Sequence, residues 1–354
     1  MTVRRATTVG GADDRTAAWA DRPTDGPASI VVLSGGLGGA RMALALTEAG
    51  LADRSTFVTN VADDWTVGGL PVCPDTDAVL YALSGRFDEE RGWGIRGDTF
   101  RGPRPGEPSW FGIGDLDRAH HEARRELLAA GASRAEATAD LALRAGIGAR
   151  VVPVTNDLVR TRVRHDRRWS GFQEWLVRDR CPAPDAVDWS GLGRAVAAPG
   201  VVEAIEDADL VVIGSSSPMA SLAPILGVAG VRNALASRRG ATVALSPVVL
   251  GRPLGSDRDR HRAAARAALM ACRGLAHTPV DHARWIASVV SHVAVDASDV
   301  TWAPAIADLG VEVILAPVIG IDPDERRTLL ASVLSEAALA GAAREPARSG
   351  TSSD

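Results

Sequence analysis

A run of glycines, Ser34-Gly35-Gly36-Leu37-Gly38-Gly39, is the first segment whose residue types suggest chemistry. Glycine lets a ligand approach the backbone N–H groups closely, and these groups bind anions where a helix begins directly after them. The spacing matches neither a P-loop nor a clean Gly-x-Gly-x-x-Gly fingerprint. At this point a phosphate or nucleotide site at Gly35, Gly36, Gly38 and Gly39 and a simple tight strand–helix turn are equal alternatives.

Acidic residues follow in two segments, of which the first is Asn60-Val61-Ala62-Asp63-Asp64-Trp65, directly after an apolar run of strand length. Open α/β sheets bind ligands at the carboxyl ends of their strands. Two adjacent carboxylates there can hold Mg²⁺ or orient a hydroxyl group. The alternative is an Asp that caps a following helix, but no helical pattern follows directly.

The second acidic segment, Pro74-Asp75-Thr76-Asp77, opens a predicted helix that runs to Leu83. Helix capping alone could explain Asp75, and the helix dipole favours Asp77 in the first turn. A second acidic pair so soon after the first nevertheless favours one cation site shared by the two segments.

The segment 110–121 gathers charged side chains at a predicted loop–helix junction, namely Asp115, Asp117, Arg118, His120 and His121. Such a set can bind a phosphate or a polar chain. Two adjacent histidines point to different sides of a helix, so at most one of them faces a site.

The last candidate segment is Gly214-Ser215-Ser216-Ser217-Pro218, which follows another strand-like run. These hydroxyl residues either wrap a phosphate or sugar or cap the next helix. Neither Gly-x-Ser-x-Gly nor a Ser-His-Asp order is present, so no acyl-transfer nucleophile is predicted.

Short apolar runs and helical patterns alternate along the chain and must position these segments. The predicted strands are 29–33, 55–59, 149–154, 210–213, 241–245 and 311–315. The predicted helices, besides 74–83, are 40–49, 117–130, 134–145, 221–236, 258–272 and 324–340. This alternation predicts a doubly wound, mostly parallel, Rossmann-like α/β sheet. Irregular insertions are predicted near 85–115 and 164–198, the second as a small inserted subdomain.

Composition narrows the class of protein further. The chain of 354 residues has a net charge of −5 and no lysine, so arginine, backbone N–H groups or a metal must meet any phosphate. The sequence has no basic stripe of the kind that binds nucleic acid, and no apolar run is long enough to span a membrane. Three scattered cysteines and the lack of a signal sequence predict a cytoplasmic protein. We expect disordered tails at 1–28 and 342–354 around one domain at 29–341.

Taken together, these segments resemble the CofD/FbiA family, the 2-phospho-L-lactate or phosphoenolpyruvate transferases of deazaflavin coenzyme F-420 biosynthesis. The resemblance runs in order from Ile30 to Ile319, through residues 33–41, 60–65, 73–81, 91–94, 110–121, 152–157, 172–175, 198–205 and 221–232. Three departures from the family pattern stand out, at Gly171, at Ser217 and at 251–255. They put the identity of the donor in question.

The resemblance implies transfer of the phospho-acid from a guanosine-diphosphate-linked donor to the deazaflavin Fo, with Mg²⁺, release of GMP and a homodimer. It implies that the glycine turn and Ser215, Ser216 and Ser217 bind the nucleotide, with Asp63 and Asp75 as metal ligands. The implied catalytic residues are Asp64, Asp77 and Arg118. Further implied binding residues are Asn60, Asp75, Asp115 and His121.

Two other classes of protein compete with this assignment. YvcK-like regulators, which bind nucleotide sugars without this catalysis, share the glycine run and the Val-Ala-Asp-Asp segment. Trp65-Thr66-Val67 stands here where those proteins have a Gly-Ser-rich run, which favours the transferase. An NAD-dependent oxidoreductase ranks third, because no clean ribose-binding acid ends the second strand.

Overall fold

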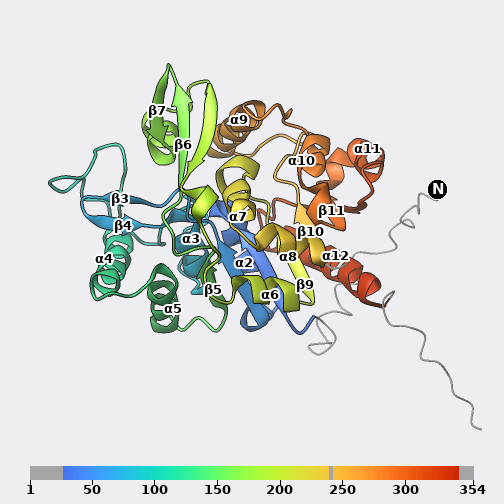
Figure 1. The fold of residues 1–354 in the computed structure, drawn as a ribbon, viewed down its shortest axis with the longest axis horizontal. Coiled ribbons are helices and arrows are strands. Elements are labelled where there is room, and N and C mark those ends of the chain that lie inside the picture. The colour runs from blue at the N-terminus through green and yellow to red at the C-terminus, as the bar shows by residue number, and fades with distance from the viewer. Residues whose placement is uncertain (1–26, 239–241, 343–354) are drawn as a thin grey trace, which may run out of the picture.

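The computed structural model describes residues 27–238 and 242–342, so nearly all of both predicted tails lies outside the described residues. Its centre is a seven-stranded sheet of order β12-β11-β10-β9-β1-β2-β5, in which every pairing is parallel (Figure 1). The strands are β1 (Ile30–Ser34), β2 (Ser55–Thr59), β5 (Arg150–Pro153), β9 (Leu210–Ile213), β10 (Thr242–Leu245), β11 (His292–Val295) and β12 (Glu312–Leu315).

Helices cover both faces of this sheet. They are α2 (Gly36–Glu48), α3 (Pro74–Leu83), α4 (Asp115–Ala129), α5 (Arg134–Arg144), α6 (Val201–Asp207), α7 (Ala223–Gly227), α8 (Val231–Ser237), α9 (Asp257–Ala271), α10 (Pro279–Ile286), α11 (Ala303–Ala307) and α12 (Pro323–Ala342). Ile30 and Val32 of β1 pack with α2, α3 and α12. Val31 and Leu33 pack with α6, α8 and α10 on the opposite face. Successive side chains of a strand point to opposite faces, so both faces must be apolar, as the predicted strands are.

The strand order confirms the predicted doubly wound, Rossmann-like fold. Chain direction across the sheet reverses at β1, whose neighbours are β2 on one side and β9 on the other. Open α/β sheets bind ligands at such a switch point, beyond the carboxyl ends of the strands. The glycine turn follows β1 and the serine segment follows β9, so the fold brings these two segments to one place.

Two smaller sheets stand outside the central one. The hairpin of β3 (Trp65–Val67) and β4 (Leu70–Val72) follows the first acidic segment. A three-stranded antiparallel sheet of order β7-β6-β8 consists of β6 (Arg160–His165), β7 (Arg168–Gly171) and β8 (Ala186–Ser190). Most of this sheet lies in the segment 164–198 that was predicted irregular, and it projects from the main sheet in Figure 1.

The structure also differs from the predicted elements elsewhere: the helices α6, α10 and α11 were not predicted. Strand β11 was not predicted, because its four residues include a histidine and give a weak pattern. The predicted single helix 221–236 is divided into a π-helical turn at 218–222, then α7 and α8. Pro224 and Gly230, whose φ is +93°, explain this division, because both residue types interrupt a continuous helix. Among the described residues, no helix has the length and apolar content to cross a membrane.

The buried side chain of His282, on α10, makes the stability of this fold depend on pH. It is fully buried, and neither ring nitrogen has a hydrogen-bond partner among the described residues. Burial, assisted by the charge of Arg266, lowers the pKa of His282 to about 3. The unfolded chain takes up this proton near pH ~6.5 and the folded chain does not, so stability falls as the pH drops below that value.

We expect His282 to contribute about 2 kcal/mol to the loss of unfolding free energy between pH ~7 and pH ~5. In His282→Leu this part of the loss is absent. Urea unfolding of both proteins at the two pH values measures the difference. An equal loss in the two proteins would contradict the assignment.

Candidate active site

A cleft of about 460 Å³ opens at the switch point of the sheet. Its lining includes the glycine turn, the serine segment 215–217, both acidic segments and the α9 face. Helix α9 packs on the three-stranded sheet through Leu269, Met270 and Val163, so that sheet forms a wall of the same region. The cleft therefore joins segments that are far apart in the sequence.

The glycine turn and the serine segment touch so closely that only glycine fits. The Ser216 hydroxyl accepts a hydrogen bond from the Gly35 N–H (2.9 Å) and donates one to the Gly35 carbonyl (2.9 Å). A Cβ on Gly38 would lie 2.2 Å from the Ser215 carbonyl oxygen. Helix α2 begins here with Gly35 as its N-cap, which offers no side chain, and the Gly36 N–H bonds to the Asp75 carboxylate. Leu37 and Gly38 of the same first turn line the cleft, and the N–H groups of a helix start can bind an anion.

Of the remaining residues predicted to bind the nucleotide, some line the cleft and one packs behind its lining. Gly36, with φ of +52°, Ser215 and Ser217 line the cleft. The Ser217 hydroxyl also caps the π-helical turn by accepting from the Ala220 N–H. Gly39 does not line the cleft: it packs against Ser34 and Val79, where a Cβ would meet their atoms at 2.7 and 3.2 Å.

Two buried carboxylates, Asp63 and Asp75, lie on either side of the Asn60 amide. Asn60 donates to Asp63 Oδ1 and, at 3.0 Å, to Asp75 Oδ2. The Ser221 hydroxyl also donates to Asp75 Oδ2 (3.1 Å). Neither Asp forms an ion pair among the described residues. Burial, together with the charges of Asp75 and Asp64, raises the pKa of Asp63 well above its usual range, and burial raises the pKa of Asp75 to about 6.

This pair fits Mg²⁺ better than a metal held by protein ligands alone. Within the described residues, no group of three or more His, Cys, Asp or Glu side chains is arranged to hold a metal ion. Magnesium usually takes one or two carboxylates and completes its octahedron with water and substrate phosphates. Asp63 and Asp75 line the cleft as two such carboxylates, and their mutual repulsion is what a bound cation would relieve.

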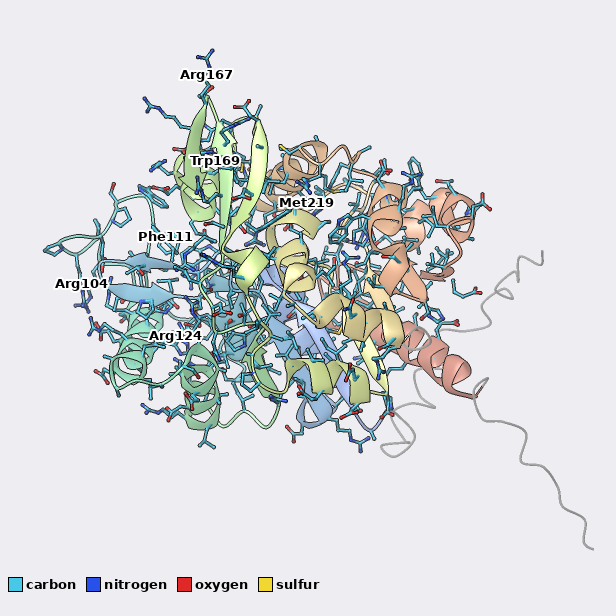
Figure 2. All side chains as sticks on the ribbon, viewed as in Figure 1. Arg104, Phe111, Arg124, Arg167, Trp169 and Met219 are labelled. Atoms are coloured by element: carbon cyan, nitrogen blue, oxygen red, sulfur yellow. The ribbon has the colours of Figure 1, made fainter. Side chains whose placement is uncertain are left out.

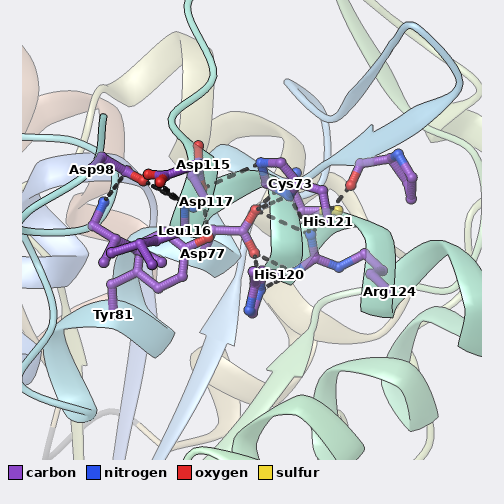
Figure 3. A network of polar contacts seen from close by, with 12 residues as sticks. Cys73, Asp77, Tyr81, Asp98, Asp115, Leu116, Asp117, His120, His121 and Arg124 are labelled. Carbon is purple, nitrogen blue, oxygen red and sulfur yellow. Dashed lines mark hydrogen bonds and ion pairs between the residues drawn. The ribbon is translucent and has the colours of Figure 1, made fainter. Parts of the chain in front are cut away.

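Asp77, predicted to be catalytic, is held in an ion pair. Arg124 donates to both of its oxygens, and His120 and the Cys73 N–H contact it at 3.1 Å each (Figure 3). Burial acts to raise the pKa of Asp77, but the Arg124 charge outweighs it and holds that pKa far below its usual range. Although Asp77 borders the cleft, its charge serves to hold α4 against α3.

His121 and Asp117 extend this network along the cleft. His121 contacts Asp117 through Nε2 (3.3 Å) and Asp77 through Nδ1 (3.6 Å). The Tyr81 hydroxyl donates to Asp117 at 2.6 Å. His121, Asp117 and Tyr81 all line the cleft, whereas His120 does not, in agreement with the expectation that at most one of the two histidines faces the site.

Three other predicted site residues have partners outside the cleft lining. Asp64 accepts from Arg134 at 2.5 Å and borders a second cavity; burial still raises its pKa to about 7. Arg118 forms a two-bond ion pair with Glu107 at 2.5 and 2.9 Å. Asp115 begins α4 and accepts from the Thr99 N–H at 2.8 Å. The structure gives each of the three a supporting contact.

Sequence reasoning missed two parts of the cleft. One is an aromatic wall of Trp93, Trp110 and Phe111, where Trp110 and Phe111 pack against Trp65 of β3. In the view of Figure 2, Phe111 lies between the β3–β4 hairpin and the sheet that carries Trp169. The other is the arginine face of α9, with Arg262 and Arg266. Their spacing of four residues on a predicted helix was the available signal.

Fold and cleft together define an α/β protein whose binding cleft lies at the switch point of a parallel sheet. The chain belongs to the CofD family, since the family described as 2-phospho-L-lactate transferase CofD matches residues 30–318. The predicted family is thereby confirmed, and with it the assignment of the chain as a transferase of F-420 biosynthesis.

Similar proteins agree with this membership. A phosphoenolpyruvate transferase of Mycolicibacterium smegmatis is 38% identical in an alignment of 251 positions that covers 65% of this chain and 77% of that protein. One of Thermobifida fusca is 40% identical in an alignment of 248 positions that covers 65% of this chain and 76% of that protein. A solved UPF0052-family protein of Bacillus halodurans shares the fold, with a TM-score of 0.53 at 17% identity over 85% of this chain and 89% of that one.

The buried Asp77–Arg124 pair predicts a large stability effect. Replacing Arg124 with Met leaves the Asp77 charge buried without its main partner, which costs about 3–5 kcal/mol of unfolding free energy. The neighbouring Arg125 is exposed, so Arg125→Met is the matched control and should change stability by less than about 0.5 kcal/mol. Urea unfolding compares the two, and similar small effects would contradict the structural role.

Proposed function

We propose that this transferase moves a phospho-lactyl or phosphoenolpyruvyl group from a guanosine-diphosphate-linked donor to the deazaflavin Fo, with release of GMP and dependence on Mg²⁺. The observation that carries the proposal is the pair Asp63 and Asp75, two buried carboxylates that form no ion pair among the described residues and lie beside the N-terminus of α2. A diphosphate that brings a divalent cation complements both features at once.

The nucleotide end is assigned to the glycine turn and the serine segment. The N–H groups at the start of α2 that Asp75 does not occupy bind phosphate oxygens, and Ser215 and Ser217 offer hydroxyl groups on the facing side of the cleft. Ser216 is occupied with Gly35, so its role is to hold the two turns together. Because these groups are fixed by the sheet, they need little reorganisation when the donor binds.

Asp63 and Asp75 would hold Mg²⁺, and Asn60 keeps the two carboxylates in place. A bound Mg²⁺ supplies charge neutralisation for the diphosphate and for the leaving GMP. Phosphoryl-type transfer depends mostly on positioning and charge stabilisation. The Fo hydroxyl oxygen bonds to the phosphorus that carries the acid, the bond from that phosphorus to the phosphate oxygen of GMP breaks, and the hydroxyl proton passes to water. No covalent enzyme intermediate is required.

The acceptor end is assigned to the aromatic wall. Trp93, Trp110 and Phe111 line the cleft next to the acidic segments, and Trp93 is 40% exposed. Aromatic side chains offer large flat surfaces on which another ring system stacks. The tricyclic ring of Fo has this shape, and its ribityl chain would then extend toward Asp63.

A direct assay tests the proposed function. The protein is incubated with Fo, Mg²⁺ and guanosine-diphosphate-linked phospholactate or phosphoenolpyruvate, and mass spectrometry follows the Fo product. We expect GMP and phospho-acid-bearing Fo in equal amounts, and no product after chelation of Mg²⁺. Absence of any Fo product with either donor, combined with tight binding of nucleotide sugars, would instead support the regulatory class.

Asp75→Asn gives a sharper test of the metal assignment. We expect turnover to fall by about a hundredfold or more, because transition-state charge stabilisation of this kind is worth several kcal/mol. The fold should keep or gain stability, since the substitution removes charge repulsion with Asp63. The control is Asp257→Asn, an exposed carboxylate on α9 with 97% side-chain exposure. Unchanged turnover in Asp75→Asn would remove this carboxylate from the site.

A further inference from the structure

One wall of the cleft carries positive charge. Arg262 and Arg266 lie one turn apart on α9 and Arg41 lies on α2, and all three line the cleft. Residues four apart share one face of a helix, so α9 presents both guanidinium groups to the same side. Since the chain contains no lysine, these arginines are the cations that this wall offers.

Within the described residues, none of the three arginines forms an ion pair. Arg262 donates to the Gly92 carbonyl at 3.2 Å, and Arg266 donates to the Pro247 carbonyl at 2.6 Å. Arg262 Nη1 and Arg266 Nε are buried and have no hydrogen-bond partner. By contrast Arg252, which also lines the cleft, is paired with Glu325 at 2.6 Å and Asp296 at 3.1 Å.

These two half-buried guanidinium groups, which form no ion pair among the described residues, destabilise the empty cleft, although the nearby Asp259 carboxylate offsets part of that cost. Burial, and then the charge of Arg258, lower the pKa of Arg262 to about 10, and burial with the charge of Arg262 lowers that of Arg266 to about 10. Both groups therefore stay charged at neutral pH. A buried charge without a partner is costly, so an anion that enters this wall gains the full benefit of donors already in place.

The neighbours of Arg262 indicate which anion fits. Besides Arg258, its charge interacts with those of Asp259, Arg41 and, less strongly, Asp75, so the basic wall adjoins the carboxylate pair assigned to the metal and the diphosphate. In a donor made of guanosine diphosphate and a 2-oxy acid, the carboxylate is attached to the carbon that bears the ester oxygen. Phosphates bound at the glycine turn therefore bring the carboxylate of the acid close to this wall.

We propose that Arg262 and Arg266, with Arg41 beside them, bind the carboxylate of the transferred phospho-acid and select acids over neutral analogues. This inference rests on the proposed function for the orientation of the donor. A planar guanidinium group binds a carboxylate through two parallel N–H bonds. The two arginines are specificity-determining residues that touch the acid but not the phosphorus that is transferred.

The test uses the full chain and two small probes in the presence of Mg²⁺. Calorimetry measures binding of phosphoenolpyruvate, which has the carboxylate, and of ethyl phosphate, which lacks it. Arg262→Gln and Arg266→Gln should each weaken phosphoenolpyruvate binding by about tenfold or more, the usual effect of losing a hydrogen bond to a charged group. Arg262→Lys should retain part of the affinity. Ethyl phosphate should bind the wild type and all variants equally.

The matched control is Arg260→Gln on the same helix, whose side chain is 56% exposed and paired with the exposed Asp257. It should bind both probes like the wild type. Unchanged phosphoenolpyruvate affinity in the Arg262 and Arg266 variants would overturn the inference, as would an equal loss of ethyl phosphate. If phosphoenolpyruvate binding depends on the arginines but no transfer to Fo occurs, the carboxylate site is supported and the proposed function is contradicted. If transfer to Fo occurs at the wild-type rate in both variants, the proposed function is supported and the carboxylate site is contradicted.

Discussion

The juxtaposition of Asp63 and Asp75 is the constraint on which the rest of the site depends. One neutral amide, Asn60, bridges these two buried carboxylates, and their raised pKa values show that the folded chain holds them at a cost. The glycine turn is shaped around the same pair, because a Cβ on Gly35 would lie 2.2 Å from Asp75 Oδ2. Stability alone favours apolar side chains at such positions, and proteins depart from that rule at functional sites.

The sequence predicted where this site lies because parallel strands end at one edge of their sheet. Polar segments after the first, second and fourth predicted strands had to converge once the strands were parallel and the order doubly wound. Asp63, Asp75 and the serine segment do line one cleft. The fold class was predictable for a related reason: buried parallel strands are apolar on both faces, so short continuous apolar runs identify them.

The sequence could not show which charged side chains form ion pairs, because their partners lie far away in the sequence. Asp64 and Asp63 are adjacent, yet Arg134, which is 70 positions away, forms an ion pair with Asp64 alone. The sequence suggested that Arg118 binds phosphate, but in the structure Arg118 forms an ion pair with Glu107 of the loop before α4. Conversely, no residue within the predicted helix 258–272 stood out in the sequence, and only the packing of α9 against the cleft showed that Arg262 lines it without forming an ion pair among the described residues.

The charges of the cleft are separated rather than cancelled, and this separation has a chemical consequence. An ion pair between Asp75 and Arg262 would neutralise both groups and stabilise the empty protein, but the fold instead engages Asp75 with Asn60 and Ser221 and Arg262 with a backbone carbonyl. Neutral partners keep each charge in place without neutralising it. Under the proposed function, the carboxylates are thereby kept for the cation and the arginines for the anion, and a metal–diphosphate joined to an acidic group would complement the cleft as a single ligand.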